Sequence, residues 1–224
     1  MKVFQKKYFK SRVPLVFFIL IMPLLFYLFV SKEKLPVYNP ADLNPELVDS
    51  SLHATESNHT VSDFRLINQN GDTITQETYK DKIYIVDFFF TRCPSICPVM
   101  SMNMEKLQER FLNSKKVMLL SISVTPKMDS VPILKTYAER YHANALKWNI
   151  TTGDKNHIYE LARKSYFAVN DYNDGLLQDF VHTSNFVLID TQKQIRGIYD
   201  GTMAKEIDEL TTDIDLLMKD LDGL

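Results

Sequence analysis

The feature that most constrains this chain is a pair of cysteines, Cys93 and Cys97, placed directly after a long apolar stretch. They are the only cysteines among 224 residues, and residues 83–90 before them form a nearly unbroken run rich in β-branched and aromatic side chains. Such a run is typical of a central strand buried on both faces, as in a parallel sheet. We therefore expect both thiols in the loop that leaves the carboxyl end of a core strand, where open α/β sheets place their functional sites.

A proline follows each cysteine and restricts the geometry of this loop. The residue before a proline is pushed out of the α region, so the two cysteines are not expected to form an i, i+4 pair inside one helix. We predict a tight loop with Pro98 at the first helical position and Cys97 near the cap. The partial positive charge of a helix start favours thiolate over thiol, and the spacing suits a metal clamp at least as well as a disulfide.

The N-terminal segment carries the pattern of a membrane anchor. Residues 1–12 are a basic flank with five Lys/Arg and no acid, and residues 13–30 contain no charge over a length that is about the minimum for a spanning helix. A cleaved signal peptide is the alternative, but the run is long for one and no small-x-small cleavage site follows it. The basic flank predicts a single-pass protein of the bacterial inner membrane, with a cytoplasmic N-terminus and the domain in the periplasm.

Charge and composition divide the rest of the chain. Residues 1–34 hold seven Lys/Arg and one Glu, so the remaining 190 residues carry −8 while the whole chain carries −2. An acidic exported domain argues against a nucleic-acid partner. Residues 31–60 contain several prolines and small polar residues without lasting periodicity, which predicts a linker. Residues 61–224 are long enough for one domain with a full hydrophobic core.

The apolar periodicity of this domain predicts alternating strands and helices. A hairpin at residues 64–67 and 73–75 comes first, and a closing hairpin precedes the last helix. Between the two hairpins we expect strands at 83–90, 117–124 and 148–151, which alternate with helices at 98–113, 131–141 and 155–165. The strands of the closing hairpin are expected at 186–190 and 195–199, and the last helix at 203–218. This order predicts a thioredoxin-like α/β fold with an N-terminal β-hairpin extension, preceded by one transmembrane helix.

A metal bound by the two thiols needs a third ligand from elsewhere. Two thiolates and one imidazole suit copper, and could also hold zinc. Of the five histidines, His53 and His59 lie in the linker, where we expect solvated side chains, and His142 and His157 fall on or beside helices. His182 stands just before a predicted strand, in the loop that a thioredoxin-like fold places against its cysteine turn. A lone histidine is usually structural, so its position alone leaves both roles open.

Residues 90–98 resemble the T-x-C-P-x-x-C-P signature of the Sco/SenC family, membrane-tethered copper proteins of cytochrome oxidase assembly. Residues 148–154 resemble the family's W-x-x-x-T-G-D segment, and residues 181–184 its H-S/T segment before a strand. The resemblance covers about residues 61–218 and implies Cys93, Cys97 and His182 as the three copper ligands.

One loop departs from the family pattern. The family usually has D-P-x-x-D after the second core strand, whereas residues 125–129 begin with Thr125 and keep only the second acid, Asp129. The resemblance therefore does not extend to any role of the first acid in copper release or partner docking.

Asp87 is hard to explain by packing alone. A carboxylate inside a buried apolar strand is costly unless it is protonated or paired. It lies six residues before Cys93, and thioredoxins place a buried acid at a similar offset, where it moves protons for the thiols. Asp87 is therefore either a proton relay for a redox-active Cys93–Cys97 pair or a satisfied core acid that pins the loop.

Three features weigh against a general disulfide reductase. Three residues rather than two separate the cysteines, no proline follows Pro132 to supply the cis-proline of thioredoxins, and His182 occupies roughly that place. Together with the resemblance to the Sco/SenC family, these features lead to the prediction of a membrane-anchored copper chaperone, and the resemblance implies that it delivers copper to the binuclear copper centre of cytochrome c oxidase subunit II, which we expect to occur by ligand exchange. A thiol reductant of the thioredoxin type would keep the cysteines reduced. The alternatives are a thiol–disulfide oxidoreductase that reduces the copper-ligand cysteines of that subunit, a peroxiredoxin-like peroxidase and a copper sensor.

Overall fold

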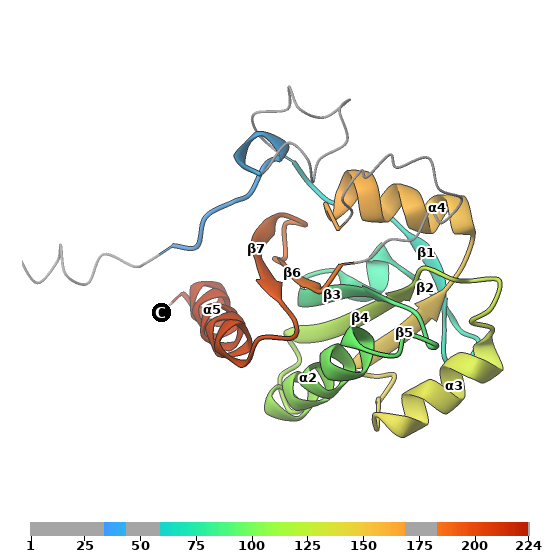
Figure 1. Ribbon diagram of the computed structural model, residues 1–224. Coiled ribbons are helices and arrows are strands. Elements are labelled where there is room, and N and C mark those ends of the chain that lie inside the picture. Colours follow the sequence, from blue (N-terminus) through green and yellow to red (C-terminus); the bar gives the residue numbers. More distant parts are fainter. Residues whose placement is uncertain (1–33, 44–58, 169–182, 224) are drawn as a thin grey trace, which may run out of the picture. The chain divides into compact units, whose positions relative to one another are not determined.

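A seven-stranded mixed sheet organises the domain in the computed structural model, which describes residues 34–43, 59–168 and 183–223 (Figure 1). The predicted basic flank, the predicted anchor at 13–30 and most of the predicted linker lie outside the described residues. Within the described ranges, no helix combines the length and apolar character needed to cross a membrane.

The sheet is parallel in its centre and antiparallel at both edges. Strands β3 (Ile83–Phe89), β4 (Val117–Ser123) and β5 (Trp148–Thr152) are mutually parallel, and the strand order is β2-β1-β5-β4-β3-β6-β7. One edge is the antiparallel hairpin β1 (Arg65–Asn68) and β2 (Thr73–Thr75), which joins β5. The other edge is the antiparallel hairpin β6 (Asn185–Ile189) and β7 (Ile195–Asp200), which joins β3.

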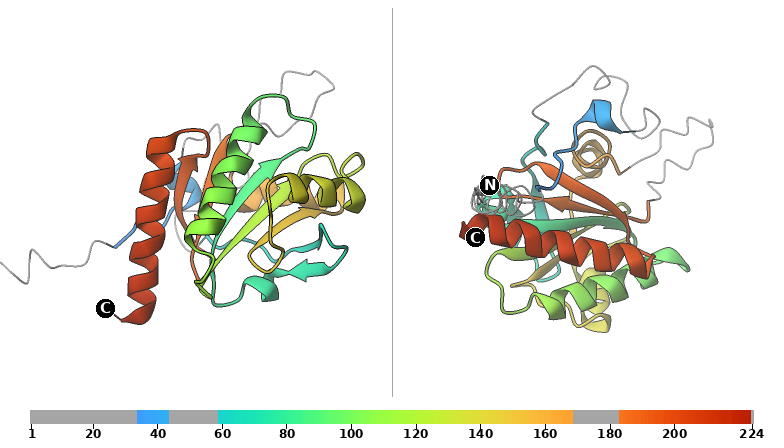
Figure 2. Two further views of the ribbon diagram at one scale, coloured as in Figure 1. Left: turned by 90° about the horizontal axis from the view of Figure 1, so that it is seen from below. Right: turned by 90° about the vertical axis from the view of Figure 1, so that its left-hand side faces the viewer.

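Helices cover both faces of the sheet. On one face lie α2 (Ile96–Arg110), α3 (Val131–Arg140) and α5 (Ala204–Asp222), and on the other lies α4 (Lys155–Glu160), continued by a π-helical turn, η5 (Leu161–Ser165) (Figures 1 and 2). Two short 3-10 helices, η1 (Pro40–Asp42) and η4 (Gln76–Tyr79), complete the described elements.

Strand β3 divides its side chains between two hydrophobic cores. Tyr84, Val86 and Phe88 enter the core shared with α4 and η5, whereas Ile83, Ile85 and Phe89 enter the core shared with α2, α3 and α5. All seven residues of the strand are buried, as expected for a central strand covered by helices on both faces. By alternation Asp87 belongs to the α2 face, the face that also holds both cysteines.

These elements confirm the predicted thioredoxin-like α/β fold with its N-terminal hairpin. The strand boundaries agree to within about two residues, which is the usual uncertainty of such boundaries. The helix predicted at 98–113 differs at its start: it begins at Ile96, with Ser95 as N-cap. Pro98 therefore occupies the third helical position, which is tolerated because amide groups in the first turn have no intrahelical partner.

The described part of the predicted linker packs on the domain instead of standing free. Tyr38 forms an isolated antiparallel bridge with Ile195 on the edge strand β7. His59, expected to be solvated, is 8% exposed, and its Nε2 lies 2.9 Å from the carbonyl oxygen of Ser165. Burial lowers the pKa of His59, and the ring stacks at a tilt on Phe167, 4.5 Å between centroids. The expectation of a solvated His59 is wrong. The composition of the linker shows that it lacks a regular period, but it does not show which of its side chains pack against the domain.

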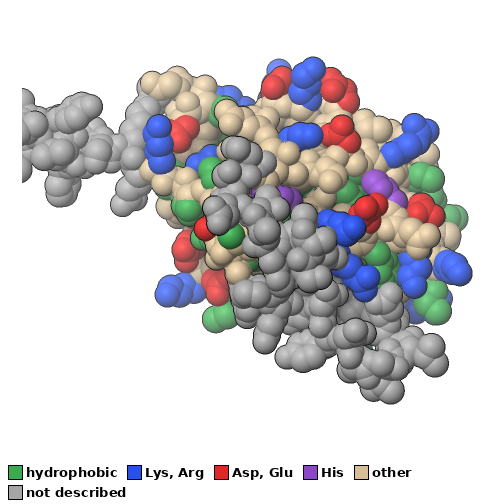
Figure 3. Space-filling view, turned by 90° about the horizontal axis from the view of Figure 1, so that it is seen from above, with side chains coloured by type: hydrophobic (Ala, Val, Ile, Leu, Met, Phe, Trp, Pro, Cys, Tyr) green, Lys and Arg blue, Asp and Glu red, His purple; other side chains and the backbone are tan. Residues whose placement is uncertain are grey.

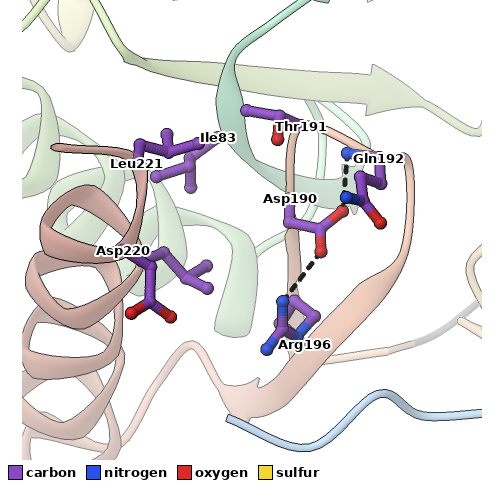
Figure 4. Close-up of a pocket in the computed structure, with 8 residues that line it drawn as sticks. Ile83, Asp190, Thr191, Gln192, Arg196, Asp220 and Leu221 are labelled. Atoms are coloured by element: carbon purple, nitrogen blue, oxygen red, sulfur yellow. Dashed lines mark hydrogen bonds and ion pairs between the residues drawn. The ribbon is translucent and has the colours of Figure 1, made fainter. Parts of the chain in front are cut away.

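A pocket of about 220 Å³ lies at the amino end of β3, the end opposite the cysteine loop (Figure 4). Asp190 and Arg196 form an ion pair at 2.8 Å on the side of the pocket made by the β6–β7 hairpin, and Asp190 also accepts backbone N–H groups from Gln192 and Gln194. Arg196 in addition donates to the carbonyl oxygens of Leu35, at 2.6 Å, and Pro36, at 2.9 Å. Asp190 and Arg196 thus satisfy one another, and Arg196 ties the segment before η1 to the sheet.

Replacing Arg196 with methionine is expected to lower the free energy of unfolding by about 1–3 kcal/mol, because a largely buried ion pair and two hydrogen bonds are lost together. Urea unfolding monitored by Trp148 fluorescence measures this. The matched control is Arg110→Met, which removes an ion pair with Asp215 whose arginine side chain is 58% exposed and should cost less than about 1 kcal/mol. Equal losses in the two variants would contradict the structural role of Arg196.

The surface on the α4 side carries charges of both signs. Where described residues are visible in Figure 3, Lys and Arg side chains alternate with Asp and Glu side chains. Among the described residues visible on this face, neither sign of charge gathers into a patch of its own.

Candidate metal centre

The two cysteines lie where the sequence predicts, at the carboxyl end of β3. Cys93 lies in the loop between β3 and α2, and its N–H closes a turn on the carbonyl oxygen of Phe90 at 3.2 Å. Cys97 lies in the first turn of α2, two residues further into the helix than expected. Both side chains are buried and neither forms a disulfide. The loop therefore presents two reduced thiols at the start of one helix.

The helix start acts on the two sulfur atoms unequally. The N–H of Cys97 points at Cys93 Sγ, with nitrogen and sulfur 3.4 Å apart. Burial opposes the thiolate of Cys93, but the N–H groups of Cys97, Ser95 and Ile96 and the thiol of Cys97 together outweigh it, so the pKa of Cys93 is lowered. Burial raises the pKa of Cys97 to about 12, and the neighbouring Cys93 and Asp87 add to this rise. Cys93 is thus the readily ionised thiol of the pair and Cys97 the protonated one.

Asp87 is buried in the core beside these thiols. Its Oδ1 accepts a short hydrogen bond from Ser121 Oγ, and Ser121 Oγ in turn accepts from Trp148 Nε1 at 2.8 Å. Burial raises the pKa of Asp87 to about 7, although the Ser121 hydroxyl opposes this. The carboxyl group is therefore both a satisfied core acid and a group that titrates near neutral pH, so the geometry is compatible with each of the two interpretations.

Ser121 is a residue of this site that the sequence did not single out. It faces Asp87 because β3 and β4 pair in parallel with Asp87 opposite Ser121. A serine inside the apolar run at 117–124 was the available signal, but only the register of the sheet shows that it meets the buried acid.

His182 lies outside the described residues, so the structure does not test it as a ligand. Within the described ranges, no three side chains of His, Cys, Asp or Glu come close enough together to hold a metal ion. The other described histidines are occupied away from the thiols: His142 Nδ1 lies 2.7 Å from Glu105 Oε1, and His157 Nε2 accepts the N–H of Arg65. His53 also lies outside the described residues.

The described chain resumes beside the cysteine loop, one residue after His182. Strand β6 runs antiparallel to β3 with Val187 opposite Val86, so the amino end of β6 lies at the carboxyl end of β3. The carbonyl oxygen of Ser184 accepts the N–H of Gly201 at 2.6 Å, and Asn103 on α2 donates to the Gly201 carbonyl oxygen at 2.8 Å. Residue 184 is thereby tied to the helix that carries Cys97.

Gly201 is required for this close approach. A Cβ at this position would lie 2.7 Å from the ring of Phe186 and 2.9 Å from the carbonyl oxygen of Ser184. Any larger residue would therefore push the start of β6 away from α2.

Comparison with known proteins settles the family. The model of the SCO1/SenC family matches residues 53–219, well over half of the chain. The chain belongs to the SCO1/SenC family. The SCO1 protein homolog of Bacillus subtilis is 31% identical over 159 residues, which are 70% of this chain and 82% of that protein.

Two solved structures of Sco proteins share the fold. BsSco, described as a member of the Sco family of cytochrome c oxidase assembly proteins and as the carrier of a disulfide switch, aligns with a TM-score of 0.61 at 30% identity, over 70% of this chain and 92% of that one. ScoI of Arabidopsis thaliana, solved with copper bound, aligns with a TM-score of 0.55 at 24% identity, over 71% of this chain and 99% of that one. At this level of identity the second likeness shows the fold.

Proposed function

We propose that this SCO1/SenC protein is a membrane-anchored copper chaperone that delivers copper to the binuclear copper centre of cytochrome c oxidase subunit II. The observation that carries the proposal is the reduced thiol pair at the start of α2, with Cys93 held against helix-start N–H groups. Thiolate sulfur is a preferred ligand of Cu(I). Family membership supports cytochrome c oxidase assembly as the process, and the copper-binding relative and the copper-bound Sco structures support copper as the cargo.

In the proposed mechanism, Cys93, Cys97 and His182 hold the ion. The chain around residue 184 is fixed to α2, which supports His182 as the third ligand because it directly precedes this fixed segment. Cys93 loses its proton first, and Cys97 must lose its proton when the ion arrives, because a coordinating thiol is deprotonated. Partner thiolates then displace the ligands one at a time. We further propose that the uncharged segment at 13–30 anchors the domain in the bacterial inner membrane, facing the periplasm.

Copper loading tests the proposal directly. The full chain, purified in detergent and reduced, is expected to bind about one Cu(I) ion, since two thiolates and an imidazole complete one site. Cys93→Ser should remove nearly all of this copper, and His182→Ala should lower the affinity by about 10–100-fold or more, as substitutions around metal ligands do. Metal analysis and competition with a Cu(I) chelator measure both effects. Full copper loading of Cys93→Ser would contradict the proposal.

A thiol–disulfide oxidoreductase is the second candidate, and Asp87 favours it. This acid is buried close to Cys97 and titrates near neutrality, as a proton relay for a thiol requires. If His182→Ala leaves copper affinity unchanged while Asp87→Asn abolishes reduction of a disulfide in subunit II, the oxidoreductase replaces the chaperone. A peroxidase would instead show rapid turnover of peroxide with a thiol donor.

A further inference from the structure

A second buried acid, Asp129, lies beside the cysteine loop and joins it to the end of β4. Its side chain is fully buried. Oδ1 accepts the hydroxyl of Thr91 at 2.6 Å. Oδ2 accepts the N–H of Thr91 at 3.2 Å, the hydroxyl of Ser123 at 2.5 Å and the hydroxyl of Thr125 at 2.9 Å. Four donors from three residues, Thr91 in the cysteine loop and Ser123 and Thr125 at the end of β4, thus meet on one carboxylate.

These contacts fix the beginning of the cysteine loop. Strands β3 and β4 are joined at their carboxyl ends by the N–H of Val124, which donates to the carbonyl oxygen of Phe89 at 2.9 Å. Asp129 continues this connection past the end of β3, because it binds both the backbone and the side chain of Thr91. Thr91 lies two residues before Cys93.

The end of the loop is fixed separately by α2. Cys93 N–H bonds to the carbonyl oxygen of Phe90, and the first turn of α2 points the N–H of Cys97 at Cys93 Sγ. The position of Cys93 between these fixed points therefore depends on Thr91 staying attached to Asp129.

We propose that Asp129 is a positioning residue for the thiol pair: by holding Thr91 it keeps Cys93 Sγ on the amide groups at the start of α2. The proposal rests on the proposed copper-binding role of the two thiols. It also accounts for Thr125, which replaces the first acid of the family pattern. The Thr125 hydroxyl donates to Asp129, whereas an acid at that position would bring a second carboxylate toward the first.

The chemistry of the contacts calls for a carboxylate. All four contacts are donated to it, and a carboxylate has two oxygens with about four acceptor sites and no donor. The variant Asp129→Asn would keep the shape of the side chain but turn an NH₂ group toward donors. Thr91→Val also keeps the shape and removes only the side-chain donor, while Thr91→Ser retains it.

The test uses the reduced full chain and two readouts, the Cu(I) affinity by chelator competition and the redox equilibrium of the Cys93–Cys97 pair with dithiothreitol. Asp129→Asn is expected to weaken Cu(I) binding about tenfold or more, as loss of a partner behind metal ligands does. It should also change the redox equilibrium constant about threefold to tenfold, the range set by one or two lost hydrogen bonds. Thr91→Val should change the Cu(I) affinity and the redox equilibrium constant in the same direction as Asp129→Asn. Thr91→Ser should leave both quantities at their wild-type values.

The matched control is Asp190→Asn, which alters another buried acid, bonded to Gln192 and Gln194 at the far end of the sheet. It should lower the melting temperature without changing either readout. If Asp129→Asn and Thr91→Val behave like this control while the wild type loads copper normally, the positioning role is wrong and the proposed function stands. If the wild type loads no copper through Cys93, the proposed function fails, and the redox equilibrium still decides the role of Asp129.

Discussion

Asparagine in place of Asp87 is expected to make the protein more stable than the wild type at pH 8 and no more stable at pH 4. Burial raises the pKa of Asp87 from its ordinary value of 3.8 to about 7 in the folded state. Below about pH 4 the group is protonated in both the folded and the unfolded chain, so it makes no difference to stability there. Between pH 4 and 7 only the unfolded chain releases the proton, and wild-type stability therefore falls as pH rises.

The size of this effect follows from the pKa difference. A shift of about three units at about 1.4 kcal/mol each corresponds to about 4 kcal/mol lost in the wild type between pH 4 and 7. The asparagine amide must find partners in the core, which costs about 1–3 kcal/mol. The net gain at pH 8 should therefore be about 1–3 kcal/mol.

Urea unfolding of the reduced, copper-free protein at pH 4.5 and pH 8 measures this difference. Asp208→Asn on the exposed side of α5 is the control, and it should leave the wild-type pH dependence unchanged. A pH dependence in Asp87→Asn as steep as that of the wild type would show that Asp87 is not the group responsible. Ser121→Ala should instead destabilise the protein at both pH values, because Trp148 Nε1 then loses its acceptor.

The sheet could be predicted from the sequence because its signal is local. The apolar runs at 83–90 and 117–124 identify buried strands, and the turn at 70–72 identifies the first hairpin. The pairing of Asp87 with Ser121 could not be predicted in the same way. It depends on the parallel register of two strands separated by a helix, which no local pattern encodes.

The cysteine loop was predicted in its place but not in its detail. The cysteine spacing and the following prolines locate the loop, whereas the helix begins two residues earlier than expected because Pro98 fits within its first turn. The four donors on Asp129 come from residues up to 38 positions away from it in the sequence and meet only after β3 and β4 have paired. The acid at 129 was visible as a family match, but its burial was not.

The two thiols are expected to react with iodoacetamide at very different rates in the folded, copper-free protein at pH 7.5, with Cys93 far ahead of Cys97. Burial raises the pKa of Cys97 to about 12, three units above its ordinary value of 9.0, which lowers its thiolate fraction about 1000-fold. The greater nucleophilicity of a more basic thiolate recovers about 20-fold of this. Cys97 should therefore react at least about 50-fold more slowly than an ordinary thiol, and the lowered pKa of Cys93 widens the gap.

Timed alkylation with fragment-ion mass spectrometry of the peptide that follows Arg92 separates the two positions. After unfolding in guanidinium chloride both cysteines should react at similar rates, which is the internal control because the chain is unchanged. Equal rates in the folded protein would mean that the start of α2 does not distinguish the sulfurs. In the proposed transfer, the copper ion or a partner thiol therefore meets Cys93 first, and Cys97 joins only after giving up its proton in the core beside Asp87.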